Sequence, residues 1–188
     1  MRQFPAFFNL EGARIVVFGD GEEAARKLRL LVSSPAELVQ VGDVALAEFA
    51  ERVVHSVPSA TRAVLESARL AIIADVPRRA EILAEVRARG IPVNVVDAPE
   101  LCDFTVPSII DRGEVVAAIG SGGNAPVLVK ALREKLEAII PQRAGEFASL
   151  AGKLRGFVSG AIPDQTARRR FWERALAGPA AAAAYAGD

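Results

Sequence analysis

A carboxylate, a glycine-rich turn and the expected start of a helix lie close together in the stretch 94–137, and together they could bind and transform an anionic ligand. Asp97 closes the apolar run 93–96, which is typical of a buried strand, so its carboxylate is expected at the end of that strand. Residues 121–124 form a flexible turn with a hydroxyl and free backbone donors, and Asn124 is expected to cap the following helix. Such an arrangement suits a negatively charged ligand.

A second candidate site lies nearer the beginning of the chain, between an expected strand and an expected helix. There the sequence has the pattern G-x-G-x-x-A, formed by Gly19, Asp20, Gly21, Glu22, Glu23 and Ala24. Glycines at these positions let the backbone approach a pyrophosphate, and the N-terminus of the helix favours its charge. The two glutamates suit the helix dipole, although they are mildly unfavourable beside a phosphate. The pattern predicts a dinucleotide site.

An acidic residue about 20 positions after such glycines often holds the ribose hydroxyls of a dinucleotide. Asp43, followed by Val44, lies 22 positions after Gly21. A carboxylate there suits unphosphorylated NAD better than NADP. The alternative is that Asp43 is a loop or helix-cap residue.

The elements that must position these residues alternate between strand and helix, which predicts an α/β fold with an open, Rossmann-like parallel sheet. Strands are expected at 14–18, 38–41, 70–74 and 91–96, helices from the glycine turn to about 32 and at 78–89, and helical or irregular segments at 44–55 and 60–67.

The second half of the chain predicts a small α+β region followed by helices. Strands are expected at 104–110 and 115–119, joined by a turn at 111–114, and helices over 141–176 with breaks at Pro141, Gly160 and Pro163. The expected domains are a Rossmann-like NAD-binding domain 1–106, a dimerisation region 107–140, a helical domain 141–178 and a disordered tail 179–188.

The composition is that of a globular protein expected in the cytoplasm, since 51% of the 188 residues are hydrophobic, 24% are charged and the net charge is zero. No signal peptide and no membrane-spanning run of roughly 20 apolar residues is expected. With one cysteine and one histidine, neither an internal disulfide nor a conventional zinc site is expected. Residues 107–178 hold 11 basic and 7 acidic side chains, which suits a polyanionic small molecule but is too weak for nucleic acid.

The order of motifs along nearly the whole chain resembles the siroheme synthase family, whose members are precorrin-2 dehydrogenases and in some cases also sirohydrochlorin ferrochelatases. The resemblance rests on Phe4-Pro5, Asn94-Val95-Val96-Asp97, Phe104, Pro107-Ser108, Arg112-Gly113, Ser121-Gly122-Gly123, Pro126, Leu132-Arg133-Glu134-Lys135-Leu136 and Arg169-Arg170-Phe171-Trp172-Glu173. Two segments depart from the family pattern. Ala74-Asp75-Val76-Pro77 stands where Ala-Thr-Asp-Asp is usual, and Ala125-Pro126 replaces Ser-Pro.

The resemblance implies NAD-dependent oxidation of precorrin-2 to sirohydrochlorin in siroheme biosynthesis, by a homodimer that could also insert ferrous iron. Asp97 is then the acid/base residue, and Ala74 and Asp75 form one wall of the cofactor site. The methyltransferase domain that is fused to some family members is expected to be absent. The residues expected at the tetrapyrrole are Arg112, Ser121, Gly122, Gly123, Asn124, Lys130 and Arg133.

Other interpretations of these residues stay open. Asp97 could cap the turn before Pro99, Ser121 could be a plain turn serine, and Asn124 a helix cap without ligand contact. The basic residues could each be solvated charges. At the level of function, the alternatives are a chelatase with a degraded NAD site, suggested by Asp20 and the altered segment 74–77, and a non-catalytic regulator that binds NAD or a tetrapyrrole.

Overall fold

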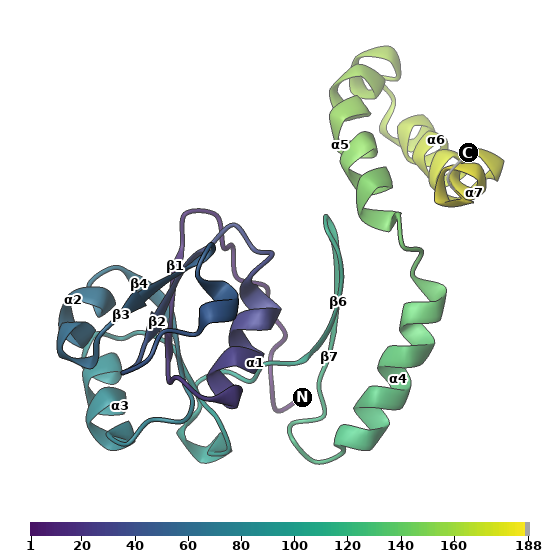
Figure 1. The fold of residues 1–188 in the computed structure, drawn as a ribbon. Helices are drawn as coiled ribbons and strands as arrows, with labels where there is room; N and C mark the ends of the chain where they lie inside the picture. Colours follow the sequence, from purple (N-terminus) through teal and green to yellow (C-terminus); the bar gives the residue numbers. More distant parts are fainter. Residues whose placement is uncertain (187–188) are drawn as a thin grey trace. The chain divides into compact units, whose positions relative to one another are not determined.

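The computed structural model describes residues 1–186 and contains two compact units, Met1–Val106 and Pro107–Asp188, which are described in turn (Figure 1). Among residues 1–186, no helix combines the length and the apolar character that a membrane span requires.

A five-stranded parallel sheet forms the centre of the first unit, with the strand order β3-β2-β1-β4-β5. Its central strand β1 pairs with both β2 and β4, and its residues 15–18 are fully buried because helices and loops cover both faces. The strands are β1 (Arg14–Phe18), β2 (Glu37–Val41), β3 (Val53–Ser56), β4 (Ala68–Ile73) and β5 (Val93–Val95).

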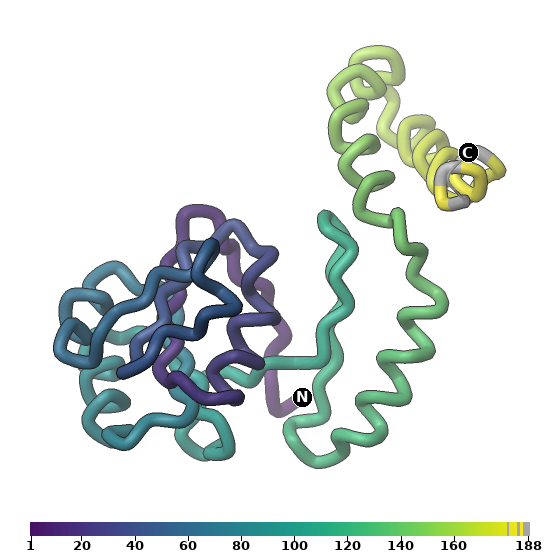
Figure 2. The backbone as a smooth tube through the Cα atoms, viewed as in Figure 1, coloured from purple at the N-terminus to yellow at the C-terminus, as the bar shows by residue number. Residues whose placement is uncertain are grey.

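Two separate apolar cores hold the helices to the sheet. On one face, Ile15 and Val17 pack with Leu28 of α1. On the other face, Phe18 packs with the cluster to which α2 and α3 contribute, including Leu65. Figure 2 traces this path through the helices α1 (Glu22–Leu31), α2 (Thr61–Leu65) and α3 (Arg79–Ala88) and the short 3-10 helices η1 (Ala47–Phe49), η2 (Pro58–Ala60) and η3 (Pro99–Leu101).

The expected α/β fold with a Rossmann-like parallel sheet is confirmed, with one additional strand. The segment 44–55 was expected to be helical or irregular. Its last three residues instead belong to β3, which pairs with β2 at the edge of the sheet. Val54 is 56% exposed, and an edge strand of four residues lacks the continuous apolar run that identifies the buried strands.

The second unit begins with an antiparallel pair, β6 (Ser108–Arg112) and β7 (Val115–Ile119), and continues with helices. Gly113 has a φ of 72° in the two-residue turn between these strands, so glycine avoids backbone strain there. The helices are α4 (Pro126–Ile139), α5 (Ala144–Ala161), α6 (Gln165–Ala177) and α7 (Pro179–Ala186).

Details of the second unit differ from the expectations. Gly160 does not break a helix but lies within α5, which ends at Ala161. Residues 179–186, expected in a disordered tail, form α7, since alanine has the highest helix propensity. Residues 187 and 188 lie outside the described part of the chain. The assignment of dimerisation to 107–140 stays a prediction.

Candidate functional site

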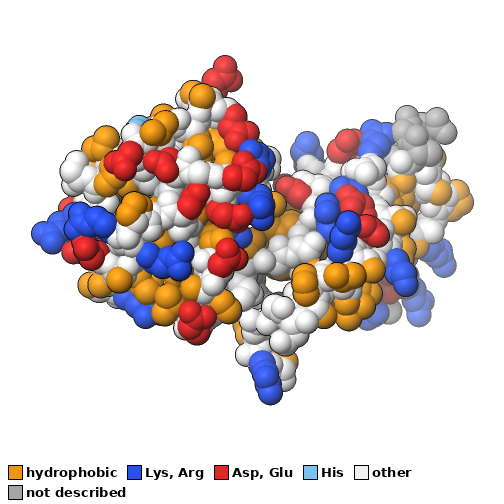
Figure 3. Space-filling view, turned by 60° about the horizontal axis from the view of Figure 1, so that its bottom comes forward, with side chains coloured by type: hydrophobic (Ala, Val, Ile, Leu, Met, Phe, Trp, Pro, Cys, Tyr) orange, Lys and Arg blue, Asp and Glu red, His pale blue; other side chains and the backbone are white. Residues whose placement is uncertain are grey.

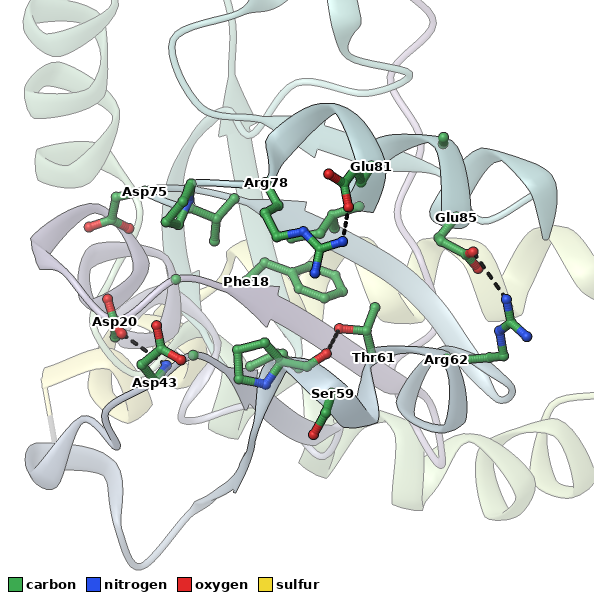
Figure 4. Close-up of a pocket in the computed structure, with 18 of the residues that line it drawn as sticks. Phe18, Asp20, Asp43, Ser59, Thr61, Arg62, Asp75, Arg78, Glu81 and Glu85 are labelled. Atoms are coloured by element: carbon green, nitrogen blue, oxygen red, sulfur yellow. Dashed lines mark hydrogen bonds and ion pairs between the residues drawn. The ribbon is translucent and has the colours of Figure 1, made fainter.

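A pocket lies at the carboxyl ends of β1, β2 and β4, where the strand order reverses and ligands of open parallel sheets bind. Its volume is about 990 Å³. In Figure 4, Asp20, Asp43 and Asp75 gather at one end of the pocket, and the ion pair of Arg62 with Glu85 lies at the other. The lining consists of Phe18, Gly19, Asp20, Val41, Gly42, Asp43, Pro58, Ser59, Thr61, Arg62, Asp75, Val76, Pro77, Arg78, Glu81, Ile82, Ala84, Glu85 and Ala88.

The glycine turn lies between β1 and α1, as the sequence pattern predicts. Gly19 has a φ of 133°, a conformation that side chains disfavour, and its N–H donates to the carbonyl of Val41 at 2.9 Å. Gly21 is the N-cap of α1 and supplies no side chain to accept hydrogen bonds from the first turn. The N-terminus of α1 therefore keeps donors that an anion could use. Ala24 is fully buried, which permits the close approach of helix and strand.

Gln40 is a structural residue of this site that the sequence analysis missed. It is 1% exposed on β2, and its amide nitrogen donates to the carbonyls of Gly19 at 2.9 Å and Val44 at 2.8 Å. Its amide oxygen accepts from the N–H of Leu46 at 3.0 Å. Gln40 thereby joins the glycine turn to the loop after β2. A lone glutamine within an apolar run carries no pattern that identifies such a role.

Asp20 of the glycine turn bonds to the loop after β2, which contains Asp43. A carboxyl oxygen of Asp20 accepts from the backbone N–H groups of Asp43 at 3.0 Å and Val44 at 3.2 Å. Asp43 is exposed and lines the pocket, whereas Val44 is 64% exposed and does not. The expected role of Asp43 in holding a ribose stays a prediction.

The segment after β4 brings Asp75 to the glycine turn. Ala74 is buried, and its N–H donates to the carbonyl of Phe18 at 2.9 Å. A Cβ atom on Gly19 would lie 2.6 Å from a carboxyl oxygen of Asp75. A Cβ atom on Gly21 would overlap the other carboxyl oxygen of Asp75 and would lie 2.9 Å from the Cγ atom of that residue. The glycines therefore leave a space that the Asp75 carboxylate occupies.

The two glutamates of the first turn of α1 do not line the pocket but pair with arginines of their own helix. Glu22 contacts Arg29 at 2.7 Å, and Glu23 contacts Arg26 at 2.9 Å. The hydrogen bond from Arg29 is the main cause that lowers the pKa of Glu22. These pairs reduce the repulsion that the glutamates would exert on a nearby phosphate.

Asp97 follows β5 and is exposed, as its proposed chemistry requires. It has a φ of 58°, in the left-handed region that non-glycine residues adopt at a cost. The N–H of the preceding Val96 donates to the carbonyl of Ile73, the last residue of β4, at 2.9 Å. Asp97 therefore lies just beyond the end of β5, the strand that pairs with β4. Asp97 is not among the residues that line the pocket, and its catalytic role stays a prediction.

The candidate residues of the second unit surround the start of α4. The Ser121 hydroxyl accepts from the N–H of Ala125 at 3.1 Å, and the Asn124 amide donates to the Ser121 carbonyl at 3.4 Å. The expected N-cap at Asn124 is wrong, since the N-cap of α4 is Ala125. Gly122 and Gly123 have φ angles of 62° and 84°, which explains glycine at both positions.

The basic candidates of the second unit differ in their surroundings. Arg112 and Arg133 each place a terminal nitrogen 3.5 Å from the carboxylate of Glu137, and the Arg112 side chain is only 9% exposed. Lys130 is exposed on α4. Arg112 and Arg133 thus share a single acidic partner and leave one positive charge in excess.

Sheet, glycine turn and switch-point pocket together define a dinucleotide-binding domain of the Rossmann type. A family model described as "Putative NAD(P)-binding" matches residues 6–108, which is more than half of the chain. The chain therefore belongs to this putative NAD(P)-binding family. A second model, "Sirohaem synthase dimerisation region", matches residues 143–188, a region that the sequence analysis assigns to the helical domain and the tail.

Curated relatives confirm the resemblance to siroheme synthases. The siroheme synthase of Methylococcus capsulatus (strain ATCC 33009 / NCIMB 11132 / Bath) is 42% identical over 200 residues, which cover 100% of this chain and 41% of the relative. That of Pseudomonas entomophila (strain L48) is 43% identical, with 100% of this chain and 42% of the relative covered. The chain spans about two fifths of the length of these relatives.

A solved structure shares the fold. "SirC, precorrin-2 dehydrogenase" matches with a TM-score of 0.76 at 16% identity, covering 93% of this chain and 89% of that chain. At this identity the likeness demonstrates the fold alone.

Proposed function

We propose that the protein oxidises precorrin-2 to sirohydrochlorin with NAD, as part of siroheme biosynthesis. The observation that carries the proposal is the switch-point pocket beside a glycine turn and a helix N-terminus without a side-chain cap. The family match over residues 6–108 and the names of the relatives and of the solved structure support it.

The dinucleotide is held by the first unit. The glycine turn would leave room for the pyrophosphate, the free N–H groups at the N-terminus of α1 would donate to it, and the Asp43 carboxylate would accept hydrogen bonds from a ribose. The adjacent carboxylate of Asp20 favours NAD over NADP, because a phosphate on the ribose would face two negative charges. When bound, NAD would supply the acceptor for a hydride.

Asp97 is the proposed proton acceptor. Oxidation of precorrin-2 removes one hydride and one proton, so a base must complement the hydride acceptor. The exposed carboxylate at the end of β5 suits this role, and its left-handed backbone is the kind of strain that occurs at functional sites.

The tetrapyrrole is a polyanion, and the excess positive charge of the Arg112–Arg133 cluster together with exposed Lys130 suits its carboxylates. The match to a dimerisation region over residues 143–188 supports a homodimer. A reducing cytoplasm suits a chain with one cysteine. Ferrous iron as a second substrate is a further part of this proposal, supported by the siroheme synthase relatives.

An anaerobic assay with precorrin-2 and NAD tests the oxidation. Absorbance is expected to show sirohydrochlorin and NADH forming together, and Asp97→Asn is expected to lower kcat about a hundredfold or more while NAD still binds. Without a sirohydrochlorin spectrum in the wild type, the proposal fails. A normal rate for Asp97→Asn would remove Asp97 from the reaction.

The chelatase alternative has one observation in its favour, because the Asp75 carboxylate occupies the space beside the glycines. Calorimetric titration with NAD and an anaerobic assay of iron insertion into sirohydrochlorin separate the two functions. Iron insertion without NAD binding would support the chelatase, whereas NAD binding followed by sirohydrochlorin formation supports the dehydrogenase.

A further inference from the structure

Asp75 lies against the glycine turn, where a negative charge does not suit a pyrophosphate. It is exposed, lines the switch-point pocket and directs its carboxylate to the glycine turn. A Cβ atom on Gly19 would approach it to 2.6 Å, and one on Gly21 would overlap it. The carboxylate thus lies in the space that opens because these two residues are glycines.

That space is the one a pyrophosphate needs. In a glycine turn of this kind, the second glycine lets the backbone come close to the pyrophosphate, and here that glycine is Gly21. Gly21 is also the N-cap of α1, so the Asp75 carboxylate lies where an N-capping side chain would begin. A carboxylate near the positive end of a helix stabilises it in the same way as a bound phosphate would.

We propose that Asp75 competes with the pyrophosphate of the dinucleotide for the glycine turn and the N-terminus of α1, and so sets the affinity of the site. The inference rests on the proposed dinucleotide site. Binding then requires the Asp75 side chain to turn away, and its negative charge continues to oppose the pyrophosphate from a short distance.

Neighbouring charges do not change this expectation. The nearby cations Arg26 and Arg29 are paired with Glu23 and Glu22, so they are not free to neutralise Asp75. Asp20 adds a further negative charge to the same end of the pocket, although its carboxylate is held by the N–H groups of Asp43 and Val44. Removal of the Asp75 carboxylate, unlike removal of the Asp20 carboxylate, therefore breaks none of the hydrogen bonds that join the two loops.

Calorimetric titration of the full chain with NAD tests the proposal. Asp75→Asn, which keeps the size of the side chain, and Asp75→Ala, which removes it, are both expected to bind NAD about tenfold more tightly than the wild type. Adenosine, which has no pyrophosphate, is expected to bind all three proteins equally in a saturation-transfer NMR experiment. Glu51→Gln removes an exposed charge elsewhere in the first unit and is expected to leave NAD affinity unchanged.

Thermal unfolding without dinucleotide gives a second readout. If Asp75 substitutes for a phosphate at α1, both variants are expected to melt a few degrees below the wild type although they bind NAD more tightly. Melting and affinity thus change in opposite directions, which a purely structural role of Asp75 would not produce.

The outcomes separate this inference from the proposed function. If the wild type binds NAD and the Asp75 variants bind it no more tightly, the inference fails and the dehydrogenase proposal stands. Weaker binding by the variants would make Asp75 a ligand of the dinucleotide and also overturn the inference. If neither the wild type nor the variants bind NAD, both proposals fail.

Discussion

At the residue scale, the candidate site depends on side chains that hydrogen-bond one loop to another, as well as on side chains that would contact a ligand. The glycine turn could be predicted because Gly19, Gly21 and Ala24 form a known pattern between a strand and a helix. Gln40 could not be predicted, because its role arises only when β2 lies beside β1. The position of Asp75 beside the glycines likewise depends on the pairing of β1 with β4, which a linear pattern does not contain.

Substitution of Gln40 by leucine is expected to lower the free energy of unfolding by about 2–4 kcal/mol. The substitution removes hydrogen bonds to Gly19, Val44 and Leu46 in a residue that is 1% exposed. Urea denaturation followed by circular dichroism measures the change. Glu51→Gln serves as the control, and a loss below about 1 kcal/mol for Gln40→Leu would show that water replaces these bonds.

Glu85 lines the pocket opposite the aspartates, and its pKa is lowered mainly by the hydrogen bond from Arg89. Because the pKa is lower in the folded protein, the stabilising contribution is present above the unfolded value of about 4.3 and is lost as the pH falls through the folded value. Arg89→Met is expected to raise the pKa of Glu85 toward its ordinary value in an NMR titration. Arg87→Met on the same helix is expected to leave it unchanged, since Arg87 donates to the carbonyl of Leu101.

At the element scale, the buried strands could be predicted from their continuous apolar runs, and the helix after the glycine turn from the helical spacing of its apolar residues. Strand β3 could not, since an edge strand of four residues is stabilised by pairing with β2 more than by its own pattern. The start of α4 was misplaced by one residue, because the Ser121 hydroxyl bonds the N–H of Ala125 and Asn124 lies outside the helix.

The junction between β1 and α1 permits a test of close packing between elements. Gly21 has a φ of −99°, which alanine tolerates, so the cost of Gly21→Ala comes from overlap with the Asp75 carboxylate. Because the exposed Asp75 side chain can turn aside, the substitution is expected to lower the free energy of unfolding by only about 0.5–1.5 kcal/mol. In an Asp75→Ala background the loss is expected to shrink, and a double-mutant cycle from urea denaturation measures the coupling. Equal losses in both backgrounds would contradict the overlap.

At the scale of the whole molecule, the chain combines a dinucleotide-binding unit with a unit whose helices keep apolar side chains at the surface. On α5, Leu150 is 50% exposed, Leu154 is 44% exposed and Phe157 is 77% exposed, and their spacing places them on one side of the helix. On the face drawn in Figure 3, apolar side chains also lie at the surface in patches between charged ones. The parallel α/β pattern of the first part of the chain could be predicted from its alternating segments, whereas the helix ends in the second part could not all be predicted, since Gly160 lies within α5.

Leu154→Glu is expected to convert the proposed homodimer into monomers, because a buried charge at an apolar interface has a high desolvation cost. Sedimentation velocity measures the change. Lys153→Glu, which alters a charge at the neighbouring exposed position, is expected to leave the dimer intact. A dimer that survives Leu154→Glu would place the interface away from this side of α5.

The central place of β1 in the sheet also bears on how the protein is made. A ribosome releases β1 before any other strand of the sheet, but its partner β4 ends only at Ile73, and β5 follows at Val93–Val95. Until β4 emerges, a nascent chain that holds β1, β2 and β3 leaves one edge of the apolar strand β1 without a hydrogen-bonding partner. Such an unpaired edge is prone to aggregation, so synthesis that pauses between β3 and β4 is expected to create a chaperone-dependent intermediate.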